Sequence, residues 1–342
     1  MSKKNARPPR LDARANERIS WKLTRYFKEK GVQTPAEANS MLDQRLSFED
    51  VEDLIKPETA LEKAQDLVWR AFEEPSKRKR ISMAKDALKL SPDCADAYVL
   101  LAEDAAEDHT EVETLLRKGI EAGRRALGDS TVQNLEVDFW KDLETRPFMR
   151  AVDGLARHLQ DYSRTEQATE LWLELLRLNP EDNLDVRIRL VPALVEIERF
   201  DEASKLIDQY KWELEPALLF SKALMLFKQK GDSDESRNAL YHAMQTNRFV
   251  IPKLLNLDAD LPDIGEDEEG TEEIEEAAAT EYLTHNFTDW LDTEGAMNWL
   301  VTILERSVEQ EKKKMKLETT FPGLRQVDTA PGILELLSHI RD

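Results

Sequence analysis

Apolar side chains in residues 149–245 recur at spacings of three and four residues, and short polar breaks separate the stripes. This spacing predicts amphipathic helices, each with one buried face. The stripes come in pairs, and successive pairs begin near Met149, Leu184 and Ala217. The chain therefore repeats a two-helix unit of about 34 residues. One such unit cannot bury its apolar face alone, so we expect neighbouring units to stack.

Two helices in about 34 residues are typical of tetratricopeptide repeats. Small side chains let the helices approach, and large ones fill the space between them. The positions that we assign to this core are Ala156, Leu159, Ala168, Trp172, Phe200, Ala203, Ala223, Phe227 and Ala243. The pattern predicts an all-α protein, a tetratricopeptide-like helical-repeat solenoid forming a right-handed superhelix with an N-terminal helical cap. Solenoids of this kind usually bind other chains rather than perform chemistry.

Composition changes along the chain suggest five segments. The first residues are basic and contain Pro8 and Pro9, which is typical of a disordered tail. The sharpest break is Asp258–Glu276, where acidic residues are frequent and basic ones are absent, which indicates a solvated linker. The predicted segments are a disordered basic tail (1–14), a helical cap (15–60), the solenoid (61–257), an acidic linker (258–278) and a C-terminal helical pair with a tail (279–342).

Charge and cysteine content narrow the function classes. The net charge of −21 argues against wholesale binding of nucleic acid or anionic membranes. No run of about 18 apolar residues occurs, so we expect no membrane span, and the N-terminus lacks the apolar core of a secretory signal. Cys94 is the only cysteine, so no internal disulfide is possible. Together these features lead us to expect a cytoplasmic protein.

Three stretches go beyond the generic repeat. They are "CADAYVLLAEDAA" (Cys94–Ala106), "NRFVIPKLL" (Asn247–Leu255) and "ATEYLTHNFTDWLDTEGAMNWL" (Ala279–Leu300). In this order they resemble the suppressor-of-tumorigenicity-seven family, a set of tetratricopeptide-like proteins, over roughly residues 60–305. The resemblance implies the repeat fold and an interaction role. It supplies no catalytic residues, and the membrane location of animal members is not carried over to this chain.

Metal, cofactor and catalytic signatures are missing from the sequence. The five histidines are isolated, and no paired cysteines occur, so we expect no zinc site. Asp258–Glu269 superficially suggests a calcium loop, but Asp263 replaces the glycine that such a loop requires. No nucleophile elbow, phosphate-binding glycine loop or kinase signature is found. We therefore expect no cofactor and no enzyme activity. Cys94 is either a packed core residue or, less in keeping with its neighbours, a reactive thiol near a helix start.

The inner face of the predicted solenoid carries the candidate binding site. The groove-facing positions of the first helices include four basic residues, Arg150, Arg157, Arg189 and Lys222. In an acidic chain, this is a local reversal of charge. We predict a stripe that receives an acidic partner segment or a C-terminal carboxylate, because the planar guanidinium of arginine can hold a carboxylate with two hydrogen bonds. The alternative is a set of solvated charges that pair with nearby acids, each pair contributing little.

Two further hypotheses concern the ends of the chain. The basic N-terminal arm could contact nucleic acid or ribosomal phosphates, with Trp21 and Tyr26 stacking on bases, or it could simply be a solubilising tail and a capping helix. The acidic run Glu266–Glu276 could fold onto the basic groove or arm and compete with a partner. The function that we predict is a non-catalytic scaffold for protein partners, with a nucleic-acid or ribosome-associated adaptor as the alternative.

Overall fold

The computed structural model describes residues 14, 16–43, 55–133, 138–256 and 271–307. Within these ranges the chain forms helices and connecting loops without any β-strand, so the predicted all-α class is confirmed. The chain divides into two compact units, Met1–Leu184 and Asp185–Asp342. This division falls inside the range predicted as the solenoid, and each unit is described here by itself.

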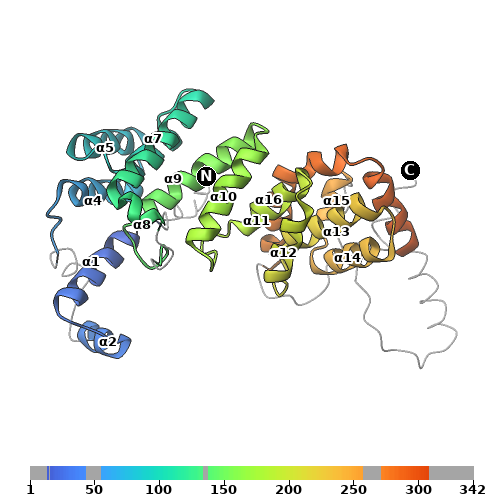
Figure 1. The fold of residues 1–342 in the computed structure, drawn as a ribbon, viewed down its shortest axis with the longest axis horizontal. Helices are drawn as coiled ribbons and strands as arrows, with labels where there is room; N and C mark the ends of the chain where they lie inside the picture. The colour runs from blue at the N-terminus through green and yellow to red at the C-terminus, as the bar shows by residue number, and fades with distance from the viewer. Residues whose placement is uncertain (1–13, 15, 44–54, 134–137, 257–270, 308–342) are drawn as a thin grey trace, which may run out of the picture. The chain divides into compact units, whose positions relative to one another are not determined.

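The first unit is built from consecutive helices that pack in pairs. Helix α4 packs on α5, α6 on α7 and α9 on α10, and α7 also packs on α9, so neighbouring pairs are in contact (Figure 1). Helix α1 precedes them and contacts α4. The helices are α1 (Asn16–Glu29), α2 (Pro35–Asp43), α4 (Ala60–Glu73), α5 (Lys77–Leu90), α6 (Ala95–Asp104), α7 (His109–Leu127), α8 (Asp129–Gln133), α9 (Arg146–Asp161) and α10 (Thr165–Leu178).

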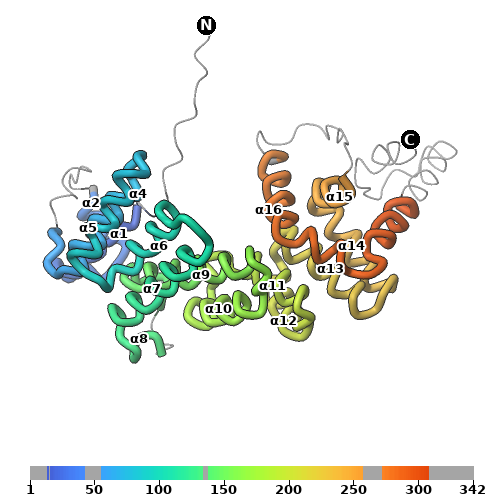
Figure 2. The backbone as a smooth tube through the Cα atoms, turned by 90° about the horizontal axis from the view of Figure 1, so that it is seen from above, coloured from blue at the N-terminus to red at the C-terminus, as the bar shows by residue number. Residues whose placement is uncertain are grey.

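The second unit repeats this arrangement. Helix α11 packs on α12, α13 on α14 and α15 on α16, while α11 and α16 both contact α13 (Figure 2). The three helix pairs predicted from the apolar stripes correspond to α9–α10, α11–α12 and α13–α14, which confirms this part of the pattern. The helices are α11 (Arg187–Glu196), α12 (Phe200–Gln209), α13 (Pro216–Lys230), α14 (Asp234–Thr246), α15 (Val250–Leu254) and α16 (Thr271–Asp292), followed by helical residues 296–307.

Local sequence signals set several helix ends. Thr59 begins α4 with a capping box, in which its hydroxyl accepts from the Glu62 amide at 3.1 Å and Glu62 accepts from the Thr59 amide at 3.1 Å. Asp108 caps α7 through the amide of Glu111. These contacts satisfy backbone N–H groups that the first helical turn leaves unpaired. Gly128 follows α7 with a φ of 77°, a conformation that side chains with a β-carbon rarely adopt.

The interior consists of small residues between larger ones. All five alanines assigned to the core from the sequence are fully buried, as are Leu159 and Trp172. Phe200 and Phe227 are only half-buried. Phe227 instead stacks on Trp299, with ring centroids 4.5 Å apart. The predicted core is therefore confirmed for its small residues and only partly for its aromatic ones.

Two glycines let α7 and α9 approach closely. A β-carbon added at Gly123 would lie 2.8 Å from Cβ of Phe148, and one at Gly119 would lie 3.2 Å from Cβ of Ala151. A contact of 2.8 Å between carbons is well inside normal van der Waals separation. The spacing of these two helices thus depends on glycine at position 123.

Among the described residues, none of the helices combines the length and the hydropathy needed to cross a bilayer.

Candidate partner-binding site

The four basic residues predicted for the groove are divided between the two units. Arg150 and Arg157 lie on α9 of the first unit, while Arg189 on α11 and Lys222 on α13 belong to the second. Each pair is therefore described within its own unit, and their alignment into one stripe stays a prediction.

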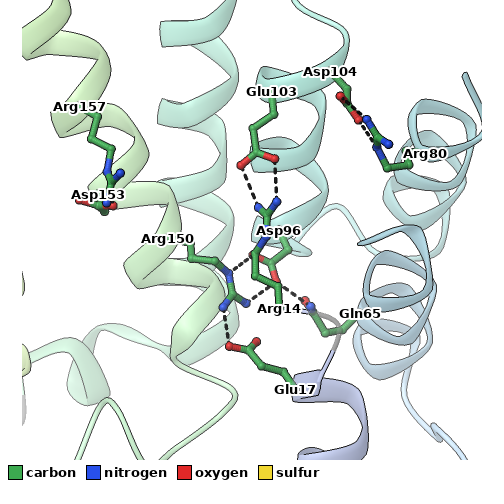
Figure 3. Close-up of polar contacts among 10 residues, drawn as sticks. All are labelled: Arg14, Glu17, Gln65, Arg80, Asp96, Glu103, Asp104, Arg150, Asp153 and Arg157. Atoms are coloured by element: carbon green, nitrogen blue, oxygen red, sulfur yellow. Dashed lines mark hydrogen bonds and ion pairs between the residues drawn. The ribbon is translucent and has the colours of Figure 1, made fainter. Parts of the chain in front are cut away.

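Arg150 is the centre of a buried polar network that joins four helices. Its guanidinium donates to both oxygens of Asp96 on α6, at 2.8 and 2.6 Å. It also donates to Glu17 on α1 at 2.8 Å (Figure 3). Gln65 on α4 completes the network by donating to Asp96 at 2.8 Å. Only 13% of the Arg150 side chain is exposed, and the Asp96 side chain is not exposed at all. Arg150 therefore binds carboxylates inside the first unit.

The electrostatics of Arg150 favour its charged form. Burial by itself lowers the pKa of a guanidinium, but the attraction and hydrogen bonds of Asp96 and Glu17 outweigh burial, so the pKa of Arg150 is raised. A buried cation of this kind is held in place by its partners, because removing a carboxylate would leave an uncompensated charge.

Glu17 lies between two guanidinium groups. Besides Arg150, its Oε1 also accepts from Arg146 at 3.3 Å. Arg146 is itself held against Trp140, with its guanidinium 4.1 Å from the ring centroid. Helix α1 therefore presents an acidic side chain to two cations at the start of α9, although Glu17 lies in a predominantly basic stretch of sequence.

Further contacts of α1 combine ion pairs with an aromatic contact. Arg14, just before the helix, forms two hydrogen bonds with Glu103, and its guanidinium lies 4.1 Å from the Phe72 ring centroid. Trp21 contacts Trp69, with ring centroids 5.8 Å apart. Two further ion pairs are Arg18–Glu73 and Arg25–Glu62. Helix α1 thus docks as an amphipathic helix, with Trp21 in the core cluster and Tyr26 packed against that cluster.

Arg157 lies seven residues after Arg150 on α9 and differs in its exposure. Its side chain is 45% exposed and pairs with Asp153, one turn earlier, at 2.7 Å (Figure 3). Asp153 also accepts from the indole N–H of Trp172 at 3.0 Å. Among the described residues, Arg157 therefore forms a single ion pair, with Asp153 on its own helix, and its side chain stays accessible.

In the second unit, Arg189 meets a helix that is distant in sequence. Its guanidinium lies 2.9 Å from Nε2 of His285 and donates to Glu281 at 3.3 Å, and both partners are on α16. Lys222 is exposed and makes no ion pair with another described residue. The predicted groove residues thus comprise one engaged arginine and one accessible cation in each unit.

The second unit also has a largely buried ion pair, which was not predicted from the sequence. Lys228 on α13 donates to Asp289 on α16 at 2.5 Å and to the carbonyl of Val195 at 3.3 Å. Burial raises the pKa of Asp289, and the nearby Lys228 opposes that rise. Nearby on α16, Trp290 donates to the hydroxyl of Tyr282 at 2.9 Å.

The acidic run and the basic arm are described only in part. Glu272 and Glu276 pair with Arg248 and Lys253, so the described end of the acidic run contacts basic residues near α15. Residues 258–270 lie outside the described ranges, and the competition hypothesis stays a prediction. Residues 1–13 also lie outside them, so the nucleic-acid alternative is untested, although Trp21 is buried here rather than available for stacking.

No cluster of metal-ligating side chains occurs within the described ranges. Cys94 is buried, and burial followed by the charge of Asp96 raises the pKa of its thiol to about 12. The thiol contacts the side-chain oxygen of Gln65 at 3.6 Å. A thiol with this pKa is a poor nucleophile at neutral pH, which favours the packing interpretation.

Comparison with known proteins identifies relatives of this chain. A Caenorhabditis elegans protein described as "Protein ST7 homolog" is 27% identical over 270 residues, covering 68% of this chain and 49% of the worm protein. A Danio rerio "Suppressor of tumorigenicity 7 protein-like" is 25% identical over 314 residues, covering 85% of this chain and 54% of its own length. The chain thus spans about half the length of these relatives. The family model described as "ST7 protein" matches residues 22–331. The chain therefore belongs to the ST7 protein family.

Proposed function

We propose that this protein is a non-catalytic cytoplasmic scaffold that binds acidic segments of partner proteins. In this proposal the helix pairs form a tetratricopeptide-like, right-handed solenoid, and partner segments lie along the faces of the first helices. The packing of consecutive helix pairs within each unit supports such a repeat.

The observation that carries the proposal is the hydrogen bond that Arg150 donates to Glu17. These residues are 133 positions apart in the sequence, and the repeat pattern assigns the basic residue Arg150 to the groove. Helix α1 is thus an internal example of a segment that a groove arginine holds through one acidic side chain, although the helix as a whole is basic. Arg189 and Glu281 repeat the arrangement in the second unit, where the partner is again a distant helix.

Arg157 and Lys222 are the residues best placed to bind an external partner. Both are exposed, whereas Arg150 and Arg189 are largely engaged inside their units. A partner carboxylate could replace Asp153 on Arg157 at little cost, because exposed ion pairs contribute only about 0–1 kcal/mol. Electrostatic complementarity of this kind favours encounter and selects the sign of the partner's charge.

The test is affinity capture with variants that leave the buried network intact. We expect Arg157→Glu with Lys222→Glu to lose partners that the unaltered protein retains. The control, Lys85→Glu with Lys205→Glu, changes the net charge equally at exposed positions outside the predicted groove, also one in each unit. Partners lost from both variants alike would indicate a non-specific charge effect and would contradict the proposal.

A further inference from the structure

A cavity of about 250 Å³ lies within the first unit between α1, α4, α7 and the start of α9. Trp21 and Trp69 form one wall, and Leu61, Leu143 and Phe148 contribute much of the remaining apolar surface. An apolar cavity of about 150 Å³ is already large enough to hold benzene. This cavity therefore has room for a ring-sized apolar group with a short substituent.

The tryptophan wall is suited to a cation. The rings of Trp21 and Trp69 are tilted by 47° to each other, with centroids 5.8 Å apart. The guanidinium of Arg25 lies 5.2 Å from the Trp21 ring, so one cation of the chain already uses this aromatic surface. Tryptophan is the aromatic side chain that attracts cations most strongly.

The charged side chains that line the cavity are all acidic. They are Glu62, Asp93 and Glu144, and no lysine or arginine contributes to the lining. Arg25 pairs with Glu62 and Arg125 pairs with Asp93, whereas Glu144 makes no ion pair with another described residue. Arg25 lies close enough to Glu144 to interact with it electrostatically, so this carboxylate is partly compensated. The lining itself still holds only carboxylates, and it therefore favours cations over anions, as does the net charge of the whole chain.

A second, larger space adjoins the cavity. A space of about 640 Å³ shares Trp21, Glu62, Leu143 and Glu144 with the first. Its other charged lining residues are of both signs, namely the cations Arg25, Lys28 and Lys141 and the acids Glu29 and Asp142. Selection for charge therefore depends on the inner cavity, where Glu144 lies on the shared wall.

We propose that this cavity binds an organic ammonium, with its cationic end near Trp21 and Glu144 and its apolar ring against the aliphatic and aromatic remainder of the wall. The site goes beyond the partner groove and does not depend on it, because neither Arg157 nor Lys222 lines the cavity.

The experiment compares two probes of similar size and opposite charge, phenethylammonium and 3-phenylpropionate, titrated into the full chain. Isothermal calorimetry and tryptophan fluorescence report binding. We expect saturable 1:1 binding of phenethylammonium and none of 3-phenylpropionate. Glu144→Gln should weaken binding of the ammonium about tenfold, whereas Glu121→Gln, an exposed acid on α7 outside the cavity, should leave it unchanged.

A second variant tests the location. Ala126 is exposed and lines the cavity, so Ala126→Trp should obstruct it without disturbing the core, and circular dichroism checks the fold. Binding of phenethylammonium should then be lost. Equal binding of the two probes, no saturable binding of the ammonium at millimolar concentration, or full binding by the folded Ala126→Trp variant would each overturn the proposal.

Discussion

Glu17 on α1 accepts a hydrogen bond of 2.8 Å from Arg150 on α9, across 133 residues of sequence. This contact attaches the N-terminal helix to a residue that the repeat pattern alone assigns to a groove. It makes α1 both part of the first unit and an example of the segment that the unit can hold.

Arg150 and Arg157 should differ sharply in their contribution to stability. Arg150→Ala leaves the buried Asp96 without its cation, and breaking a buried pair costs about 3–5 kcal/mol. Arg157→Ala removes only an exposed pair and should change the free energy of unfolding by about 0.5 kcal/mol or less. Urea denaturation of the two variants checks this. Equal decreases in the free energy of unfolding would show that the Arg150 network stabilises the protein no more than a surface ion pair does.

Gly123 should be intolerant of a methyl group. Gly123→Ala places a β-carbon 2.8 Å from Cβ of Phe148 and should destabilise the protein by about 1–3 kcal/mol through overpacking of α7 on α9. The matched control is Gly154→Ala on α9, where the nearest atom is the flexible end of Leu116 at 3.0 Å. In thermal unfolding, the melting temperature of Gly154→Ala should be well above that of Gly123→Ala. The reverse order would contradict the close approach of α7 and α9 at Gly123.

Glu62 should stabilise the protein in a pH-dependent way. Burial favours its neutral form, but backbone hydrogen bonds at Glu58 and Thr59 and the Arg25 side chain outweigh burial and lower its pKa below the ordinary value of 4.5. The ionised form is therefore preferred in the fold. Its contribution is fully present above about pH 4.5 and is lost as the pH falls through the lowered pKa.

The variant Glu62→Gln isolates this charge, because glutamine can still take part in a capping box. We expect the variant to be less stable than the unaltered protein at pH 7, with the difference disappearing at strongly acidic pH. Urea titrations at both pH values measure it. A difference that stayed constant with pH would assign the effect of Glu62 to its shape rather than its charge.

Docking of α1 should depend on salt. Several of its contacts are ion pairs, and the partially exposed ones, such as Arg14–Glu103, are screened at high ionic strength. Amide hydrogen exchange in α1 should therefore become faster in 1 M NaCl, while exchange in α9, which buries a long apolar face, should change little. Equal responses of the two helices would mean that apolar contacts, chiefly Trp21 on Trp69, hold α1 in place.

The fold was predictable where its signal is local. Val152, Leu155 and Leu159 lie at helical spacing on one face of α9, and all three are buried in the structure. Such spacing depends only on helix geometry, so one sequence suffices to read it. The half-buried Phe200 and Phe227 show where this reasoning stops. A repeat pattern predicts which face of a helix a residue lies on, but not how much of its side chain is buried.

The site was predictable only in part, because ion pairs join residues that are far apart in sequence. The groove-facing position of Arg150 follows from its place on the first helix, but its engagement by Glu17 requires α1 to be docked. The clue in the sequence was an acid in a basic stretch, four residues before Trp21. The same holds for Lys228 and Asp289, whose pairing depends on how α16 meets α13.

The most direct test of the account is the affinity of an acidic peptide for the exposed groove cations. Fluorescence anisotropy at low salt would use a labelled peptide of residues 266–276, with the same peptide carrying glutamine for glutamate as its control. The account predicts that the acidic peptide binds more tightly than its control. It also predicts that Arg157→Glu with Lys222→Glu weakens this binding about tenfold, a loss of about 1.4 kcal/mol, while Lys85→Glu with Lys205→Glu has much less effect. Equal affinities for both double variants would contradict it.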